Sequence, residues 1–177
     1  MIEVLDEKEM TGNITEILPR KNELIRPAVA NIDQALVVFA VTKPKPHYNL
    51  LDRFLVMMER KEIPVVLCFN KTDIASHPEI AELKEVYTGC GYPVIFTSAK
   101  EEENISELKS LLKGKTTSIA GPSGVGKSSL INLLQSEVKM ETGSISKKID
   151  RGKHTTRHSE LIVIGEESYI CLLYTSD

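Results

Sequence analysis

Residues 121–128 read GPSGVGKS, and this segment constrains the fold of the 177-residue chain more than any other. Glycines at this spacing let the backbone turn so that successive N–H groups point inward at the start of a helix. A short strand-like run, Thr117 to Ala120, precedes the segment. An apolar face at helical spacing follows it, made of Leu130, Ile131, Leu133 and Leu134. The segment therefore predicts a strand, a loop and a helix that bind the phosphates of a nucleotide.

The residues expected to contact the nucleotide in this loop are Gly121, Ser123, Gly124, Val125, Gly126, Lys127, Ser128 and Ser129. The Lys127 ammonium can reach the β- and γ-phosphates as a point charge, and the Ser128 hydroxyl can ligate Mg²⁺. The alternative is a glycine-rich turn that binds nothing, and the motifs described next disfavour it.

The tetrapeptide Asn70 to Asp73 reads NKTD and ends an almost continuously apolar run from Ile63 to Phe69. Such a run predicts a parallel strand covered on both faces, and ligands bind at the carboxyl ends of such strands. An ionised Asp73 can accept two hydrogens from a guanine edge, where adenine offers no matching pair. Asn70 has a donor and an acceptor for base and phosphate loop, and the Lys71 stem can lie along the base. Standing alone, the tetrapeptide fits a capped turn equally well.

A second polar segment, Thr97 to Lys100, reads TSAK and follows another short strand-like run. Its backbone N–H groups, at Ser98, Ala99 and Lys100, can meet the guanine carbonyl oxygen. By itself the segment would better fit a polar cap before a helix from Ile105 to Lys113. In the company of NKTD it predicts a second guanine-binding loop.

The segment Arg151 to His158 reads RGKHTTRH and follows the phosphate loop by about one helix and one loop. A threonine at this place can give its hydroxyl to Mg²⁺ and its backbone to a γ-phosphate, so that a triphosphate orders the segment. Thr155 and Thr156 are both candidates for nucleotide binding, and Thr156 is preferred as the metal ligand.

A net charge of −3 argues against a protein that coats nucleic acid, so any RNA contact must be local. The best local cluster comprises Lys147, Lys148, Arg151, Lys153 and Arg157, together with His154 and His158. A solvated loop that binds nothing would explain the same charges. Because the cluster is expected near the γ-phosphate, RNA binding and a solvated loop are about equally well supported.

Strand-like and helix-like segments alternate along the chain and predict an α/β fold with a parallel sheet and helices on both faces. The expected strands include Ala35 to Val41, Ile63 to Phe69 and Val94 to Thr97, and one expected helix carries the stripe Leu50, Leu51, Phe54, Leu55 and Met58. Two hairpins are expected at the ends. The first, within Ile2 to Pro27, turns near Thr11 to Asn13, and the second turns at Gly165 and Glu166.

The phosphate loop follows the guanine motifs, whereas in an ordinary GTPase it precedes them. In this order, and in the segments GPSGVGKSSLIN, RGKHTTRH, NKTD, TSAK and IRPAVANIDQALVV, the chain resembles the ribosome small-subunit-dependent GTPase A family (RsgA, also called YjeQ or YloQ). The resemblance implies a circularly permuted P-loop G domain at 35–170, preceded at 1–34 by an OB-fold remnant and a lead-in segment. It also implies Mg²⁺-dependent GTP hydrolysis in late assembly of the small (30S) ribosomal subunit, contact with its rRNA, and His154 as a candidate for orienting the attacking water.

The chain differs from the family pattern at both ends. Family members have a complete OB-fold and a C-terminal zinc domain, and we expect Zn²⁺ only in that further domain, because Cys68, Cys90 and Cys171 show no C-x-x-C pairing. The family's second switch, D-T-P-G, is replaced by Cys171 to Asp177, and we expect these seven residues to be foreign to the protein. The alternative function is therefore a guanine-nucleotide-binding module that does not hydrolyse GTP. A P-loop ATPase or kinase is disfavoured by NKTD.

The composition, 41% hydrophobic and 27% charged, is that of a globular protein. No apolar run approaches the roughly 18 residues of a membrane span, and no secretory signal follows Met1. We expect a cytoplasmic monomer whose partners are GTP or GDP and the small subunit, without a membrane.

Overall fold

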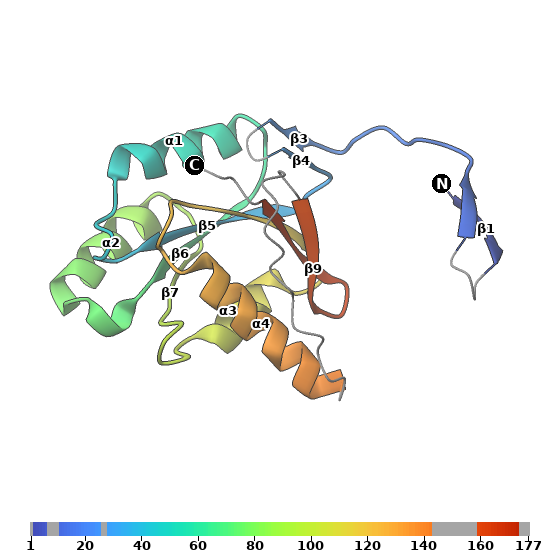
Figure 1. Cartoon of the computed structure of the whole chain (residues 1–177). Coiled ribbons are helices and arrows are strands. Elements are labelled where there is room, and N and C mark those ends of the chain that lie inside the picture. The colour runs from blue at the N-terminus through green and yellow to red at the C-terminus, as the bar shows by residue number, and fades with distance from the viewer. Residues whose placement is uncertain (1, 7–10, 26–27, 143–158, 174–177) are drawn as a thin grey trace.

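A six-stranded sheet forms the centre of the computed structural model, which describes residues 2–6, 11–25, 28–142 and 159–173. The strand order is β7–β6–β5–β8–β10–β9 (Figure 1). In chain order these strands are β5 (Gln34–Ala40), β6 (Val65–Asn70), β7 (Val94–Phe96), β8 (Thr116–Ala120), β9 (Ser159–Gly165) and β10 (Ser168–Leu173). All neighbours are parallel except β9 and β10, which are antiparallel. The predicted α/β class and parallel-rich sheet are confirmed.

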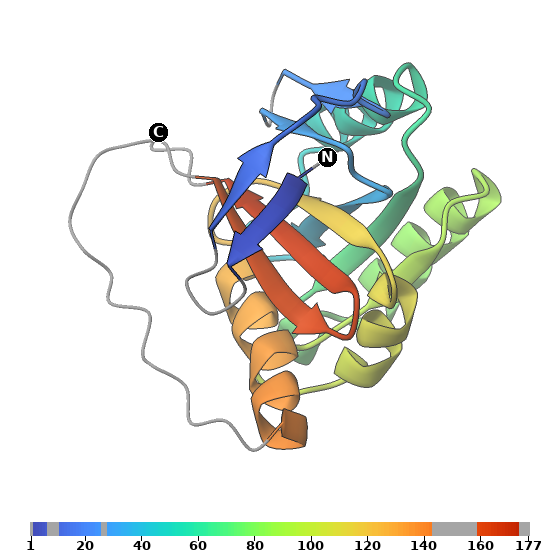
Figure 2. The same ribbon diagram turned by 90° about the vertical axis from the view of Figure 1, so that its right-hand side faces the viewer.

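Helices cover both faces of this sheet, as expected (Figures 1 and 2). They are α1 (Tyr48–Glu59), α2 (His77–Gly89), α3 (Ile105–Leu112) and α4 (Lys127–Thr142), with a short 3₁₀ turn, η1 (Thr72–Ile74). Alternate residues of β5 face opposite ways: Val37 packs in the core under α1 and α2, and Leu36 packs in the core with α3 and α4. This explains why β5 is apolar on both faces. Within the described residues, no helix is both long and apolar enough to cross a membrane.

The parallel register brings the carboxyl ends of four strands to one edge of the sheet. Ala40 of β5 pairs with Asn70 of β6, and Phe69 pairs with Phe96 of β7. On the other side of β5, Val37 pairs with Ala120 of β8. The segments NKTD, TSAK and GPSGVGKS therefore all begin at this edge.

The lead-in segment, which precedes β5, is bonded to the opposite end of the sheet, where β5 and β8 begin. It forms a small hairpin of β3 (Glu23–Leu24) and β4 (Val29–Ala30), and Leu24 is buried in the core under α1. The Asp33 carboxylate accepts hydrogen bonds from the Lys21 ammonium and the Thr116 N–H, each at 2.8 Å. These two bonds lower the pKa of Asp33. The lead-in segment therefore completes the core beside β5 and β8.

The two expected terminal hairpins are present, and the predicted turn position needs correction in both. The first consists of β1 (Ile2–Asp6) and β2 (Thr11–Ile14), so the turn predicted near Thr11 to Asn13 is wrong. Gly and Asn are turn residues, but here Asp6 already pairs with Thr11 and the ladder continues to Ile2 with Ile14. In the second hairpin, β9 includes Gly165, so the turn lies at Glu166 and Glu167, one residue later than predicted. Strand β10 extends to Leu173, so part of the segment expected to be foreign belongs to the sheet; its origin stays a prediction.

We predict that the β1–β2 hairpin is the least protected part of the described fold. Figure 1 shows it standing away from the sheet, and a lone two-stranded hairpin is only marginally stable in water. Amide hydrogen exchange should be fast in Ile2–Asp6 and Thr11–Ile14, and slow in the fully buried strands β5 and β6. Protection of β1 and β2 comparable to that of β5 would contradict this expectation.

Candidate nucleotide-binding site

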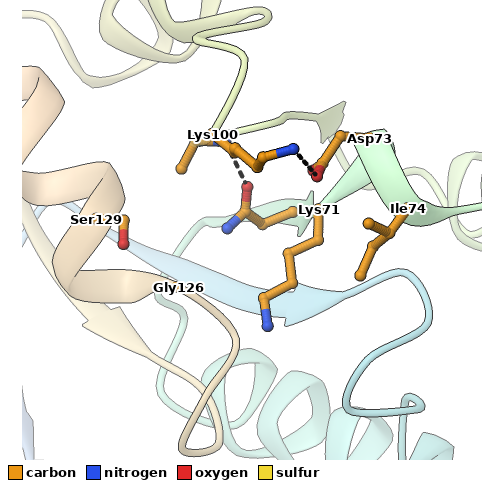
Figure 3. A pocket seen from close by; sticks show the side chains of 8 residues that line it. Lys71, Asp73, Ile74, Lys100, Gly126 and Ser129 are labelled. Atoms are coloured by element: carbon orange, nitrogen blue, oxygen red, sulfur yellow. Dashed lines mark hydrogen bonds and ion pairs between the residues drawn. The ribbon is translucent and has the colours of Figure 1, made fainter.

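A pocket of about 340 Å³ lies at the edge where the parallel strands end. The residues that line it are Asn70, Lys71, Asp73, Ile74, Ala99, Lys100, Gly126 and Ser129 (Figure 3). They come from three segments of the chain that are far apart in sequence. The structure therefore brings together NKTD, TSAK and the glycine-rich loop, as the motifs predict.

The glycine-rich loop is held against its neighbours so closely that two of its glycines have no room for a side chain. Gly121 and Gly126 both have positive φ, at 144° and 97°. A Cβ at Gly121 would collide with the Val38 carbonyl of β5, and a Cβ at Gly126 would collide with the Asn70 side-chain amide. Glycine is required at these positions for both backbone conformation and space. The loop thus takes its shape from β5 and from NKTD.

The helix that follows the loop starts at Lys127, as predicted. The Lys127 ammonium donates to the carbonyls of Gly121 and Pro122, both at 2.7 Å. The side chain at the end of the loop is thus bonded to the residues at its beginning. Ser128 and Ser129 are exposed in the first turn of α4, while Leu130 is buried against the sheet. A helix N-terminus, a lysine and exposed hydroxyls at one place form a suitable site for phosphate groups.

Asn70 joins all three segments of the site. Its side chain is 1% exposed, at the end of β6. The amide Nδ2 donates to the Val125 carbonyl in the glycine-rich loop at 2.9 Å. The amide Oδ1 accepts from the Thr97 hydroxyl and from the Ala99 N–H, each at 3.1 Å. The predicted contact with the phosphate loop is present, and the acceptor side of the amide holds TSAK.

Asp73 lies at the pocket with its carboxylate held by the neighbouring loop. Its Oδ1 accepts a hydrogen bond from the Ser98 hydroxyl at 2.9 Å, and its side chain is 10% exposed. The Lys100 ammonium lies 3.9 Å from Oδ2 (Figure 3). It also lies 3.0 Å from the Glu101 carboxylate. The hydrogen bond and the charge of Glu101, and to a smaller extent the charge of Asp73, raise the pKa of Lys100. The site therefore offers an acceptor carboxylate to a ligand edge that carries hydrogen-bond donors.

Ile74 and Lys71 form the rest of the pocket near Asp73. Ile74 is 49% exposed and presents an apolar surface to the pocket. Lys71 has a left-handed backbone with φ of 68°, and its ammonium donates to the Lys43 carbonyl at 2.7 Å. This contact ties NKTD to the loop that follows β5. The stem of Lys71 lines the pocket, which is compatible with the predicted position along a base.

Two of the three TSAK N–H groups predicted to meet the guanine oxygen already have protein acceptors. The Ser98 N–H donates to the Glu103 carbonyl at 3.3 Å, and the Ala99 N–H donates to Asn70. Their predicted contact with a guanine oxygen stays a prediction, since such a contact would have to share or replace these bonds.

Sequence reasoning missed two contributors to the site. Thr97 is fully buried and connects Asn70 to Cys68, whose sulfur is 3.3 Å from the Thr97 hydroxyl oxygen. Burial raises the pKa of the Cys68 thiol to about 12, so this thiol is a neutral core group. Glu103 bonds to both guanine-motif segments. No local pattern marks Glu103, because its partners are set by tertiary structure.

Several predicted site residues lie outside the described part of the chain. They are His154, Thr155 and Thr156, with the basic cluster at 147–158. Their predicted roles stay predictions. Among the described residues, there is no group of three His, Cys, Asp or Glu side chains that could hold a metal ion.

The fold and the site together define a P-loop G domain of the circularly permuted class, in which the phosphate loop follows the guanine motifs. A protein-family model described as RsgA GTPase matches residues 17–171. The chain therefore belongs to the RsgA GTPase family.

Two curated relatives with the name small ribosomal subunit biogenesis GTPase RsgA are similar over 96% of the chain. The protein of Agathobacter rectalis is 62% identical and that of Alkaliphilus metalliredigens 52%, and the alignments cover 56% and 58% of those proteins. The crystal structure of YjeQ from Thermotoga maritima matches with a TM-score of 0.77 at 35% identity, over 96% of this chain and 56% of that one. YloQ, described as a circularly permuted GTPase, matches with a TM-score of 0.70 at 34% identity, over 94% and 52%. The chain thus spans about half the length of the relatives it matches.

We predict that Gly126→Ala destabilises the folded protein even without nucleotide. The new Cβ would displace the Asn70 amide and would also occupy a positive φ, a strain on the order of 1–3 kcal/mol. The matched control is Gly124→Ala, which also has a positive φ, of 77°, but meets nothing within 4 Å. Thermal melting should place the Gly126 variant clearly below the Gly124 variant. Equal melting temperatures would show that the contact with Asn70 contributes nothing.

Proposed function

We propose that this chain is the G domain of a GTPase that hydrolyses GTP to GDP and phosphate during late assembly of the small (30S) ribosomal subunit. The observation that carries the proposal is the Asn70 amide, which joins a guanine-type motif to a phosphate-type loop at one pocket. Membership of the RsgA GTPase family and the names of the curated relatives support it.

In this proposal Asp73 selects the base. Guanine presents an N–H and an exocyclic amino group on one edge, and a carboxylate accepts from both. Ser98 holds one oxygen of Asp73, and each carboxylate oxygen has a further lone pair for the base. Ile74 and the Lys71 stem supply apolar surface for the ring. A site whose acceptors lose their donors when the wrong base enters can discriminate between bases by about 10⁴-fold.

The glycine-rich loop and the start of α4 bind the phosphates. Phosphoryl transfer requires mainly positioning and charge stabilisation, and Lys127 supplies the charge. On binding GTP or GDP, its ammonium would exchange the carbonyls of Gly121 and Pro122 for phosphate oxygens. Ser128 is an exposed hydroxyl beside Lys127 and suits Mg²⁺, which prefers oxygen ligands from phosphates, water and few side chains. The ion would neutralise charge that develops on the phosphates.

The remaining roles fall to residues outside the described ranges. Thr156 or Thr155 would sense the γ-phosphate, His154 would orient the attacking water, and the basic cluster at 147–158 would contact rRNA. Placing all three functions in one segment would couple docking on RNA to the state of the nucleotide. The protein would act in the cytoplasm as a monomer, and Zn²⁺ would belong to a further domain.

We predict that Asp73→Asn exchanges guanine for xanthine nucleotides. The new amide donates where the carboxylate accepts, and this suits the 2-oxo group of xanthine instead of the 2-amino group of guanine. Calorimetric titration should show weaker GDP binding and new XDP binding. Unchanged GDP affinity without any gain in XDP binding would mean that Asp73 does not contact the base.

Hydrolysis is tested by single-turnover assays on this chain with and without purified small subunits. We expect GTP to compete for the site where ATP does not, and small subunits to accelerate hydrolysis. Tight GDP binding with no hydrolysis under either condition would favour the binding module over the enzyme.

Lys127→Ala should lower nucleotide affinity by orders of magnitude, because it removes the charge placed at the phosphates. The charge-matched control is Lys84→Ala, which replaces an exposed lysine of α2.

A further inference from the structure

We propose that Glu103 is a positioning residue for guanine recognition. It forms hydrogen bonds with both the NKTD loop and the TSAK loop, and these bonds are called the clamp below. By holding the two loops together, they orient the Asp73 carboxylate toward the 2-amino group of the base. This inference rests on the proposed guanine-binding function. It assigns the specificity of the pocket partly to a side chain that lies outside the two motifs.

The main chain of Glu103 is paired with TSAK. Its N–H donates to the Ser98 carbonyl at 2.9 Å, and its carbonyl accepts from the Ser98 N–H at 3.3 Å. These two bonds form an isolated antiparallel bridge. Ser98 is the residue whose hydroxyl donates to Asp73, and it is fully buried. The backbone of Glu103 thus fixes the position of the group that holds Asp73.

The side chain of Glu103 reaches the other loop. Its Oε2 accepts a hydrogen bond from the Thr72 hydroxyl at 2.9 Å. Thr72 is the residue directly before Asp73, and its N–H donates to the Thr97 carbonyl at 3.1 Å. The loops are therefore joined by side chains at two successive residues: at Thr72 by the Glu103 carboxylate, and at Asp73 by the Ser98 hydroxyl.

This clamp matters because Asp73 must present its oxygens at a defined angle. Hydrogen bonds weaken steeply as they bend, so a small rotation of the η1 turn would lower the bond to one guanine donor before the other. Asn104, which follows Glu103, is anchored separately by a bond from its amide to the Phe96 carbonyl at 2.8 Å. Loss of the Glu103 carboxylate therefore frees the Thr72 hydroxyl, while the Thr72 N–H keeps its bond to Thr97 and α3 keeps its own attachment.

The experiment compares two nucleotides that differ only at the group in question. Inosine diphosphate lacks the 2-amino group of GDP, so it can use only one of the two predicted bonds to Asp73. Dissociation constants for both nucleotides are measured by calorimetry on the full chain and on Glu103→Ala, Glu103→Gln and Thr72→Val. Glu102→Gln is the control, since Glu102 is an exposed neighbour outside the pocket and the clamp.

We expect Glu103→Ala and Thr72→Val each to weaken GDP binding about three- to tenfold, in keeping with the loss of one exposed bond to a charged group. Binding of inosine diphosphate should change much less, so the preference for GDP should shrink. Glu103→Gln keeps an acceptor oxygen and should retain most of the preference. The double variant should be no worse than either single one, because both remove the same bond.

Equal weakening of both nucleotides would overturn the proposal, since it would show that Glu103 only stabilises the loops. An unchanged preference for GDP in Glu103→Ala and Thr72→Val would overturn it as well. Melting curves identify any variant that fails to fold, and the milder Glu103→Gln and Thr72→Val pair then decides the question. If the parent chain itself prefers neither GDP over inosine diphosphate nor GDP over ADP, the guanine-binding function fails first, and the clamp fails with it.

Discussion

The buried amide of Asn70 is the interaction on which the site depends. It lies at the end of β6 and is almost inaccessible to water, so both its donor and its acceptor must find partners within the protein. The donor takes the Val125 carbonyl, and the acceptor takes Thr97 and Ala99. A buried polar group without a partner costs about 1–3 kcal/mol. The geometry of one side chain therefore keeps the three loops in register, and the amide lies so near Gly126 that no side chain fits at that position.

The wall of the pocket that reads the base is built from short polar contacts on a rigid frame. The strands under it are buried on both faces, while the loops above them carry exposed charges such as Lys100 and Glu101. Exposed pairs of this kind contribute little to stability. The Lys100 ammonium of this pair also lies 3.9 Å from the Asp73 carboxylate. The division between a rigid frame and a polar rim is common in sites of parallel α/β proteins.

Sequence reasoning predicted the frame well because its signals are periodic or strongly local. The apolar run before NKTD, the helical stripe after Lys127 and the glycines of the phosphate loop each specify their own structure. Reasoning failed at Thr11 to Asn13, where a local turn signal lost to strand pairing. It also missed Glu103, whose partners Ser98 and Thr72 are fixed only when two strands lie side by side. Contacts of this type depend on register between loops, and a single sequence carries no periodic trace of them.

The position of β8 in the sheet has a consequence for biosynthesis. This strand inserts next to β5, yet it is made only after β5, β6 and β7, and the bond from Asn70 to Val125 spans 55 residues. The N-terminal part of a domain emerges from the ribosome first, and pairs of strands that are distant in sequence form slowly. When the strands with the guanine motifs leave the ribosome, the edge of β5 that pairs with β8 therefore has no partner strand. β8 closes that side, and the loop after it supplies the Val125 carbonyl to the Asn70 amide and Gly126 and Ser129 to the pocket. A nascent chain therefore cannot form this pocket until nearly three quarters of this sequence has been synthesised.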